Sequence, residues 1–126
     1  MYSDAACNLI NSIYNDKGDI QTVNTVNHGA ISNFEPDEIV EVSCRITKDG
    51  PVPVKVGSLP KAVNGLVQEI KSFEVAGAAA AVTGDRNKAL LALMINPMVR
   101  SQEAAKIVLE ELLEAHKKYL PQFFKS

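Results

Sequence analysis

The sequence predicts an α+β domain in which an antiparallel sheet packs with about four helices. Three observations favour this class. Apolar residues recur at helical spacing near the start, two stretches around an Asp-Gly turn alternate apolar and polar residues, and the second half carries apolar helical stripes. The order is helix, strands, helices, unlike the strand-helix alternation of a nucleotide-binding sheet. The 126 residues suit one domain, expected to span positions 1–126.

The chain is expected to open with a helix from about Ser3 to Tyr14. Ser3 is the expected N-cap, and the run Asp16-Lys17-Gly18 is expected to end the helix. One face should be buried, because the apolar residues recur at intervals of three and four. These residues are Ala6, Leu9, Ile10, Ile13 and Tyr14.

Three strands are expected next. β-branched residues favour a strand over 20–26, and the Asn, Gly and Pro of 27–38 indicate an irregular connection. From Val40 to Thr47 apolar residues alternate with polar ones, as in a half-buried strand. The "KDGP" turn leads into a second alternating arm, which belongs at the sheet edge because its two prolines lack a backbone donor. The apolar residues of this arm are Val52, Val54 and Val56.

Three helices are expected from Pro60 onwards. The first continues into the Ala-rich segment 75–82, which lies either in the centre of the core or against a surface outside this chain. The second begins at about Asp85 and ends at the next proline, and the last runs from Ser101 to Leu120. The stripe of the first helix consists of Val63, Leu66, Val67, Ile70 and Phe73.

The composition argues against several classes of protein. With 46% hydrophobic and 22% charged residues the chain is ordinary globular material, and no apolar run approaches the ~20 residues of a membrane helix. The net charge of -2, with basic residues scattered, argues against a nucleic-acid partner. Two distant cysteines and the lack of a signal segment favour a cytoplasmic location.

Few residues are candidates for chemistry. The two cysteines and two histidines could supply four zinc ligands, but none of the close spacings that pair such ligands is present. We expect Cys7 and Cys44 to be small core residues, and His116 to be a solvated cap of the last helix. His28, in a loop, is the one histidine placed for chemistry, yet no spacing supplies it with a nucleophile or an orienting group.

The other common signatures of a catalytic site are missing from the sequence. The acidic pairs Asp37-Glu38 and Glu110-Glu111 belong to a turn and to a solvated helix face. The glycines form neither a G-x-G-x-x-G motif nor a phosphate-binding loop. We therefore expect no catalytic, cofactor-binding or metal-binding residue in this chain taken alone.

Four segments carry a specific resemblance. They read "YSDAACNLINSIYNDKGDIQTVNTVNHGAI", "PDEIVEVSCRIT", "VGSLPKAVNGLVQEIKSFEVAGAAAAVTGD" and "EAHKKYLPQFF". In this order they resemble the C-terminal part of family 4 glycoside hydrolases, most of all of members that cleave 6-phospho-β-glucosides. The match covers essentially the whole chain, with one departure at "SNFEPDEI", where such proteins more often have Leu-Pro before the acidic pair.

The resemblance implies a fold similar to the C-terminal domain of lactate and malate dehydrogenases. It also implies a redox cleavage that uses NAD, a divalent metal such as manganese, and a tyrosine base. In the family these groups precede the segment seen here, so the chain is expected to lack an N-terminal NAD-binding domain. Tyr2 lies downstream of the family's base, and Cys7 and His28 do not match its metal ligands.

Under this resemblance the domain is a wall of the substrate pocket, inactive without the NAD-binding domain. Tyr2 and Ser3 are candidates for the pocket rim, because free N–H groups at the start of a helix favour a sugar phosphate. Ser3 as a plain helix cap is the other interpretation. The implied partners are the N-terminal nucleotide-binding domain and a phosphorylated disaccharide substrate.

Two further expectations concern assembly. The apolar surface of the Ala-rich segment and of the next helix predicts that the chain forms a homo-oligomer. The alternative to a dependent enzyme domain is a freestanding interaction or binding module that keeps the fold without the chemistry.

Overall fold

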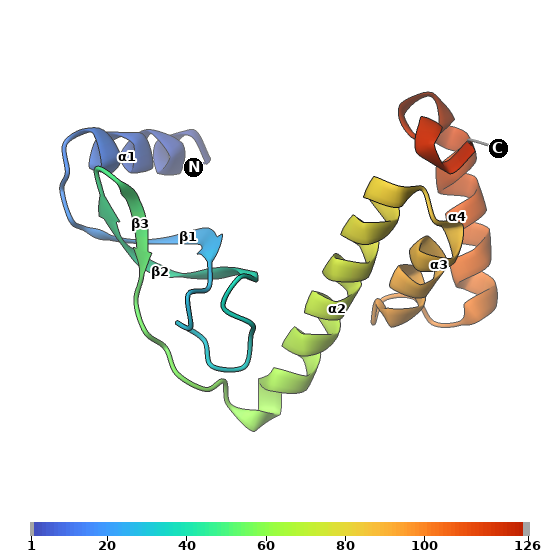
Figure 1. The fold of residues 1–126 in the computed structure, drawn as a ribbon, viewed down its shortest axis with the longest axis horizontal. Coiled ribbons are helices and arrows are strands. Elements are labelled where there is room, and N and C mark those ends of the chain that lie inside the picture. Colours follow the sequence, from blue (N-terminus) through green and yellow to red (C-terminus); the bar gives the residue numbers. More distant parts are fainter. Residues whose placement is uncertain (1, 125–126) are drawn as a thin grey trace. The chain divides into compact units, whose positions relative to one another are not determined.

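The computed structural model describes residues 2–124. They form two compact units, one ending at Pro60 and the next beginning at Lys61. The first contains α1 (Tyr2–Tyr14), β1 (Ile20–Val26), β2 (Ile39–Thr47) and β3 (Gly50–Pro53). The second contains α2 (Lys61–Thr83), α3 (Arg86–Ile95), α4 (Gln102–Ala115) and the short 3₁₀ turns η1 (Lys117–Tyr119) and η2 (Pro121–Phe124) (Figure 1). The α+β prediction, with three antiparallel strands and four helices, is confirmed for the described residues.

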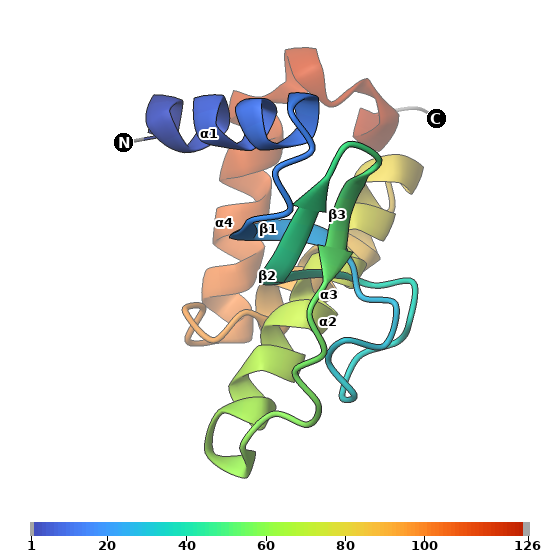
Figure 2. The same ribbon diagram turned by 90° about the vertical axis from the view of Figure 1, so that its left-hand side faces the viewer.

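The sheet has the order β1-β2-β3, with antiparallel pairing throughout. Val23 of β1 lies opposite Val42 of β2, and Cys44 of β2 lies opposite Pro53 of β3. Along β2 the even-numbered residues are buried and the odd-numbered ones are not, as the alternation predicted. Figure 2 shows β2 and β3 side by side as a hairpin, with β3 at the edge where its prolines need no partner.

The edge strand is shorter than expected, since it ends at Pro53 and leaves Val54 and Val56 beyond it. Val54 still donates its N–H to the Ser43 carbonyl, but Val56 donates to the Ala30 carbonyl instead, 2.8 Å away. The chain leaves β2 here because the connection between β1 and β2 supplies the next acceptor. The predicted alternation of Val52, Val54 and Val56 is therefore wrong as a strand pattern: all three are exposed.

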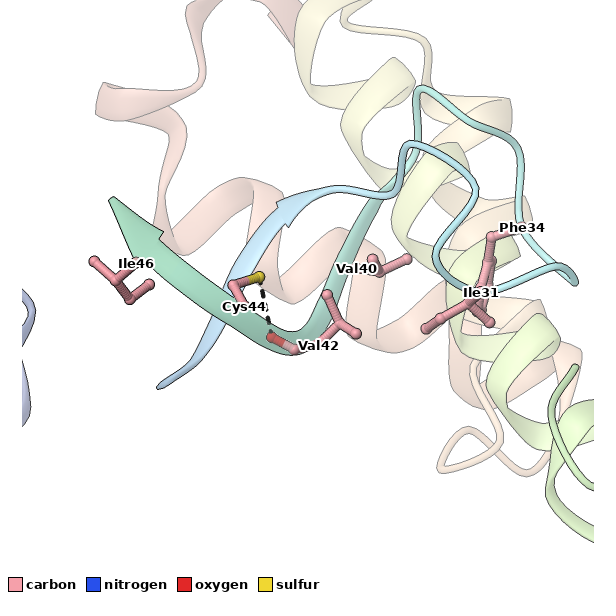
Figure 3. Packing of buried hydrophobic residues seen from close by; sticks show 6 residues of the cluster. All are labelled: Ile31, Phe34, Val40, Val42, Cys44 and Ile46. Carbon is pink, nitrogen blue, oxygen red and sulfur yellow. Dashed lines mark hydrogen bonds between the residues drawn. The ribbon is translucent and has the colours of Figure 1, made fainter. Parts of the chain in front are cut away.

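One apolar cluster forms the core of the first unit. Four of its members come from one face of β2 and two from the connection that precedes it, as Figure 3 shows. Leu9 and Ile13 of α1, with Val23 and Leu59, pack against this cluster. Each fully buried side chain contributes about 1.5–3 kcal/mol, so β2 is the best-anchored element of this unit. The six members are Ile31, Phe34, Val40, Val42, Cys44 and Ile46.

Small residues bring α2 and α3 together in the second unit. Ala80 of α2 and Ala92 of α3 are both buried, and an added Cβ at Gly77 would meet the Ala92 methyl at an ordinary 4.0 Å. The Ala-rich segment therefore has one face in the core. Its other face is exposed, with Val75 and Val82 in contact with solvent. The first alternative therefore holds for the face that carries Ala80, and the second stays a prediction for the exposed face.

Two capped helices complete this unit. The Asp85 carboxylate accepts from Asn87 and Lys88 at the start of α3, and the Ser101 hydroxyl accepts from Ala104 at the start of α4. Buried residues four apart in α4 form its inward stripe, and an Arg86–Glu110 ion pair joins α3 to α4. The stripe consists of Ala105, Leu109 and Leu113.

The last helix is shorter than predicted, because α4 ends at Ala115 rather than Leu120. The N–H of Tyr119 donates to the His116 carbonyl three residues earlier, so the chain tightens into a 3₁₀ turn. His116 is the exposed C-cap of α4, as expected. Within residues 2–124, none of the helices combines the length and apolar character that crossing a bilayer requires.

Candidate functional site

The amino-terminal half of α1 stands clear of the core of its unit. Every residue from Tyr2 to Asn8 is exposed, and the Tyr2 side chain retains 96% of its accessible surface. Tyr2 lies on the same helical stripe as Leu9 and Ile13, which do pack on the core. The sheet covers this stripe only at Leu9 and Ile13, and the ring of Tyr2 is exposed to solvent.

Ser3 does not cap this helix as predicted, because the helix already includes Tyr2 and places Ser3 inside its first turn. Its backbone N–H is still among the first four, which have no acceptor within a helix. The same turn contains the acidic Asp4, which suits a helix N-terminus and reduces the attraction for an anion. Ser3 and Tyr2 remain candidates by position.

The predicted buried face of α1 is only partly buried. Leu9 and Ile13 contact the core, whereas Ile10 and Tyr14 are exposed, as is Ala6. The sheet contacts the side of the helix that carries Leu9 and Ile13, and the apolar residues extend around the helix beyond that contact. Ala6, Ile10 and Tyr14 therefore form an exposed apolar strip on α1 that another surface could contact.

A polar cluster joins the far end of α1 to β1. The Ser12 side chain, 1% exposed, donates from its hydroxyl to Asp19 Oδ2 at 3.1 Å. Gln21 Nε2 donates to both partners, at 2.8 Å to Ser12 Oγ and 2.9 Å to Asp19 Oδ2. The three side chains form a closed triangle that borders a cavity of about 400 Å³ along α1.

The electrostatics of this triangle favour anchoring over catalysis. The hydrogen bond from Gln21 and then that from Ser12 lower the pKa of Asp19 below its ordinary value of 3.8. A carboxylate with a lowered pKa is a weak general base at neutral pH, so Asp19 is poorly suited to activate Ser12 as a nucleophile. The triangle instead fixes the orientation of α1 relative to β1, and thereby the positions of Tyr2 and Ser3.

We expect the triangle to make the first unit less stable in acid. Because the folded pKa of Asp19 is lowered, its contribution is complete above the unfolded value of 3.8 and is lost as the pH falls through the folded value. Asp19→Asn should therefore lower the melting temperature at pH ~7, with the difference from the parent vanishing towards pH ~2. Asp37→Asn, an exposed carboxylate of the same unit, is the control. A difference that stays constant over this pH range would contradict the anchoring role.

Asn27 organises the connection between β1 and β2. It is fully buried, and its Nδ2 donates to the carbonyls of Ile31, Phe34 and Glu35 at 3.0–3.1 Å, while its Oδ1 accepts from the Ile31 N–H at 2.8 Å. This set satisfies backbone groups that the irregular chain cannot pair with itself. His28 follows at once, exposed, with a φ of 46° in the left-handed region.

The structure separates the other residues considered for chemistry. Cys44 is buried in the core, as predicted, and burial raises the pKa of its thiol. Cys7 is exposed, so its assignment to the core is wrong: it lies on the side of α1 that the sheet does not cover. Among residues 2–124, no three His, Cys, Asp or Glu side chains gather into a group that could hold a metal ion.

Neither the Ser12–Asp19–Gln21 triangle nor the role of Asn27 was predicted from the sequence. A weak signal existed for the first, because Asp19 and Gln21 are two apart at the start of a strand and so share one face. No local pattern points to Asn27, since its partners lie four to eight residues away in an irregular segment.

These features define an α+β domain whose first helix is hydrogen-bonded to β1 at one end and exposed at the other. The family model described as "Family 4 glycosyl hydrolase C-terminal domain" matches residues 2–99. The chain belongs to this family, and the resemblance stated from the sequence is confirmed.

Two curated relatives match nearly the whole chain. A "Probable 6-phospho-beta-glucosidase" of Bacillus subtilis (strain 168) is 65% identical over 123 residues, covering 98% of this chain and 28% of the relative. A "6-phospho-beta-glucosidase" of Escherichia coli (strain K12) is 43% identical, covering 97% of this chain and 27% of the relative. The chain thus spans little more than a quarter of these relatives.

Solved structures agree with the family assignment. The 6-phospho-beta glucosidase from Thermotoga maritima, solved with NAD and glucose-6-phosphate, matches with a TM-score of 0.87 and 32% identity over 95% of this chain and 29% of its own. A 6-phospho-alpha-glucosidase from gut microorganisms, solved with NAD and Mn²⁺, matches with a TM-score of 0.88 and 26% identity over 93% of this chain and 27% of its own.

Proposed function

We propose that this domain is the carboxyl-terminal part of an NAD- and manganese-dependent 6-phospho-β-glucosidase that acts in the cytoplasm. The observation that carries the proposal is the 65% identity, over 98% of the chain, to a probable 6-phospho-beta-glucosidase. The related structures with NAD, Mn²⁺ and glucose-6-phosphate support the cofactors and the class of substrate.

The residues of this domain do not themselves fit the cofactors. Residues 2–124 contain no group of metal-ligating side chains, and the sequence has no Gly-rich phosphate loop. NAD and the metal would therefore be held by a nucleotide-binding domain outside these 126 residues. The exposed strip on α1, which includes Ile10 and Tyr14, offers apolar surface for contact with such a domain.

The contribution of this domain to catalysis would be positional. The first turn of α1 supplies backbone N–H groups, the Ser3 hydroxyl and the exposed ring of Tyr2 at one end of an anchored helix. Together these groups suit the rim of a pocket for a phosphorylated sugar: N–H groups and the hydroxyl bind oxygen atoms, and an aromatic ring packs on a sugar face.

A domain exchange tests the proposed function. The matching 123 residues of the Bacillus subtilis relative are replaced by this chain, and hydrolysis of a chromogenic 6-phospho-β-glucoside is measured with NAD, Mn²⁺ and a reductant. We expect activity within about tenfold of the parent relative, and none from the 126-residue chain alone. A chimera that folds and binds NAD but does not hydrolyse the β-glucoside would contradict the proposal, as would preference for the corresponding α-glucoside.

The rim assignment predicts a change in substrate binding. In the active chimera, Tyr2→Ala or Ser3→Ala should raise the KM for the phosphorylated substrate about threefold to tenfold and leave kcat largely unchanged, because uniform binding is lost. Tyr119→Ala removes an exposed tyrosine elsewhere in the chain and serves as the control. If KM is unaltered in both α1 variants, these residues do not line the pocket.

The second unit supports a homo-oligomer. Exposed apolar side chains occur on all three of its α-helices and after α3, beyond what packing within the unit covers. The most exposed are Val82 at 83% and Met98 at 87%. Interfaces between identical chains most often close around a two-fold axis, so a dimer is the simplest assembly.

We expect the chain to have about twice its 13.6 kDa mass in solution. The measurement is light scattering after size exclusion at ~100 μM, where an interface of standard size is populated. Val82→Lys combined with Met98→Lys should return the mass to one chain, whereas Asn87→Lys, an exposed polar position on α3, should not. A parent chain that stays at 13.6 kDa would show that this surface does not drive association.

A further inference from the structure

The connection between β1 and β2 begins with a tight turn that presents His28. His28 and Gly29 both have left-handed backbones, with φ values of 46° and 76°, and the turn closes through the Ala30 N–H and the Asn27 carbonyl at 2.8 Å. A left-handed backbone costs a residue with a Cβ about 1–2 kcal/mol. Such strain persists where the surroundings impose it, and the buried Asn27 network does so here.

The turn is fixed against the segment that follows β3. The N–H groups of Val56 and Gly57 both donate to the Ala30 carbonyl, at 2.8 and 3.0 Å, and the Ser32 N–H donates to the Gly57 carbonyl at 2.9 Å. Lys55 lies in this segment. Three backbone hydrogen bonds therefore join the segment after His28 to the segment after Lys55 and hold these two residues, distant in the sequence, near each other.

A hollow of about 370 Å³ lies between the turn and this segment. Its lining includes two groups that carry or can gain a positive charge and no carboxylate. The acidic side chains of the same connection, Glu35, Asp37 and Glu38, are not part of the lining. Within residues 2–124, neither His28 nor Lys55 forms an ion pair with a carboxylate. The lining consists of His28, Gly29, Ala30, Val52, Pro53 and Lys55.

We infer that this hollow binds a small phosphate oxyanion, free or as a phosphate monoester, between the side chains of His28 and Lys55. An ammonium group and an imidazole N–H are both donors to phosphate oxygen, and Val52 and Pro53 complete the lining beside them. The inference goes beyond the proposed function, because binding here requires no hydrolysis.

The two histidines of the chain make the test internally controlled. Ring signals of His28 and His116 are followed by NMR in the 126-residue chain at constant pH and ionic strength while inorganic phosphate is added. His116 is the exposed cap of α4 and reports any general response to the salt. We expect His28 to shift with saturation in the low millimolar range and His116 to change only slightly. Equal, unsaturated shifts of both rings would overturn the inference.

Variants locate the site. Lys55→Gln should weaken phosphate binding about tenfold, since one charge-assisted contact is lost. Lys48→Gln, on the β2–β3 turn of the same unit, should change it less than twofold. His28→Asn keeps a residue that tolerates the left-handed backbone and removes the imidazole ring, so it should weaken phosphate binding without unfolding the turn. Because this variant has no His28 ring signal, its phosphate binding is measured as the rise in melting temperature when phosphate is added. Equal effects of the two lysine variants would overturn the inference.

Three ligands distinguish the source of the anion. Inorganic phosphate and glucose 6-phosphate should both saturate the His28 signal, and glucose should not. If glucose 6-phosphate saturates the His28 signal at about a tenth of the inorganic phosphate concentration that does so, the site binds phosphate monoesters. If both ligands saturate the signal at similar concentrations, the site recognises only the phosphate oxyanion. Saturation by glucose itself would overturn the inference. None of these outcomes depends on glucosidase activity, so they are independent of the domain-exchange result.

Discussion

Replacing Asn27 by alanine should lower the free energy of unfolding of the first unit by about 3 kcal/mol or more. The variant removes a fully buried side chain with four hydrogen bonds and leaves the carbonyls of Ile31, Phe34 and Glu35 without that donor. An unsatisfied buried polar group costs about 1–3 kcal/mol, and partial replacement by water limits the sum. The connection should then open first, because its own backbone cannot pair these groups.

Urea unfolding followed by circular dichroism, with amide hydrogen exchange of β2, measures this effect. Asn24→Ala is the matched control, because Asn24 is an exposed asparagine of β1 and should change the stability by less than about 0.5 kcal/mol. A loss below about 1 kcal/mol for Asn27→Ala would mean that the connection holds its shape by other contacts.

Replacing Gly84 by alanine should destabilise the second unit by a similar amount. Gly84 has a φ of 73°, and a Cβ built there would overlap the carbonyl of Gln122 in η2. The left-handed backbone costs about 1–2 kcal/mol and the overlap about 1–3 kcal/mol more. The segment is fixed at this corner, since Gln122 Nε2 also donates to the Ala81 carbonyl at 2.8 Å.

Gly65→Ala is the control of opposite sign. Gly65 lies within α2, has no positive φ, and an added Cβ there meets nothing within 4 Å. Alanine should therefore stabilise the helix by about 0.5–1 kcal/mol. Thermal unfolding of both variants measures the contrast. If Gly84→Ala melts at the parent temperature, the C-terminal turn does not pack on this corner in solution.

Local patterns predicted most of the elements. The alternation from Val40 to Thr47 correctly predicted both the strand and its buried face, and the two prolines correctly placed β3 at the edge. The predicted ends of β3 and α4 were wrong, because at both ends the backbone N–H groups change their hydrogen-bond acceptors. Val56 leaves the sheet because Ala30 offers an acceptor, and α4 stops at Ala115 because the next turn tightens. At such ends two acceptors compete for one N–H group, and they are either distant in sequence or of similar energy. The periodicity of side chains carries no information on which acceptor is chosen.

The candidate site was predictable in part. Tyr2 and Ser3 came from the family resemblance rather than from their residue types, and their role stays a prediction. Cys7 was assigned to the core because cysteine is commonly buried, but which side of α1 is covered depends on how far the sheet extends. The paired position of His28 and Lys55 follows from hydrogen bonds between segments about 25 residues apart, which no spacing rule describes.

The sequence by itself determined the α+β class, the order of helices and strands, the buried face of β2 and the family. Side-chain periodicity reflects backbone geometry directly, and the similarity to a relative extends over 98% of the chain. Only the tertiary structure decided which polar groups pair. The Ser12–Asp19–Gln21 triangle and the hollow between His28 and Lys55 depend on bringing separate elements together, and Asn27 depends on how the irregular connection after it folds back. A polar side chain is stable inside a protein only where its partners arrive, and that depends on how the chain closes rather than on any local pattern.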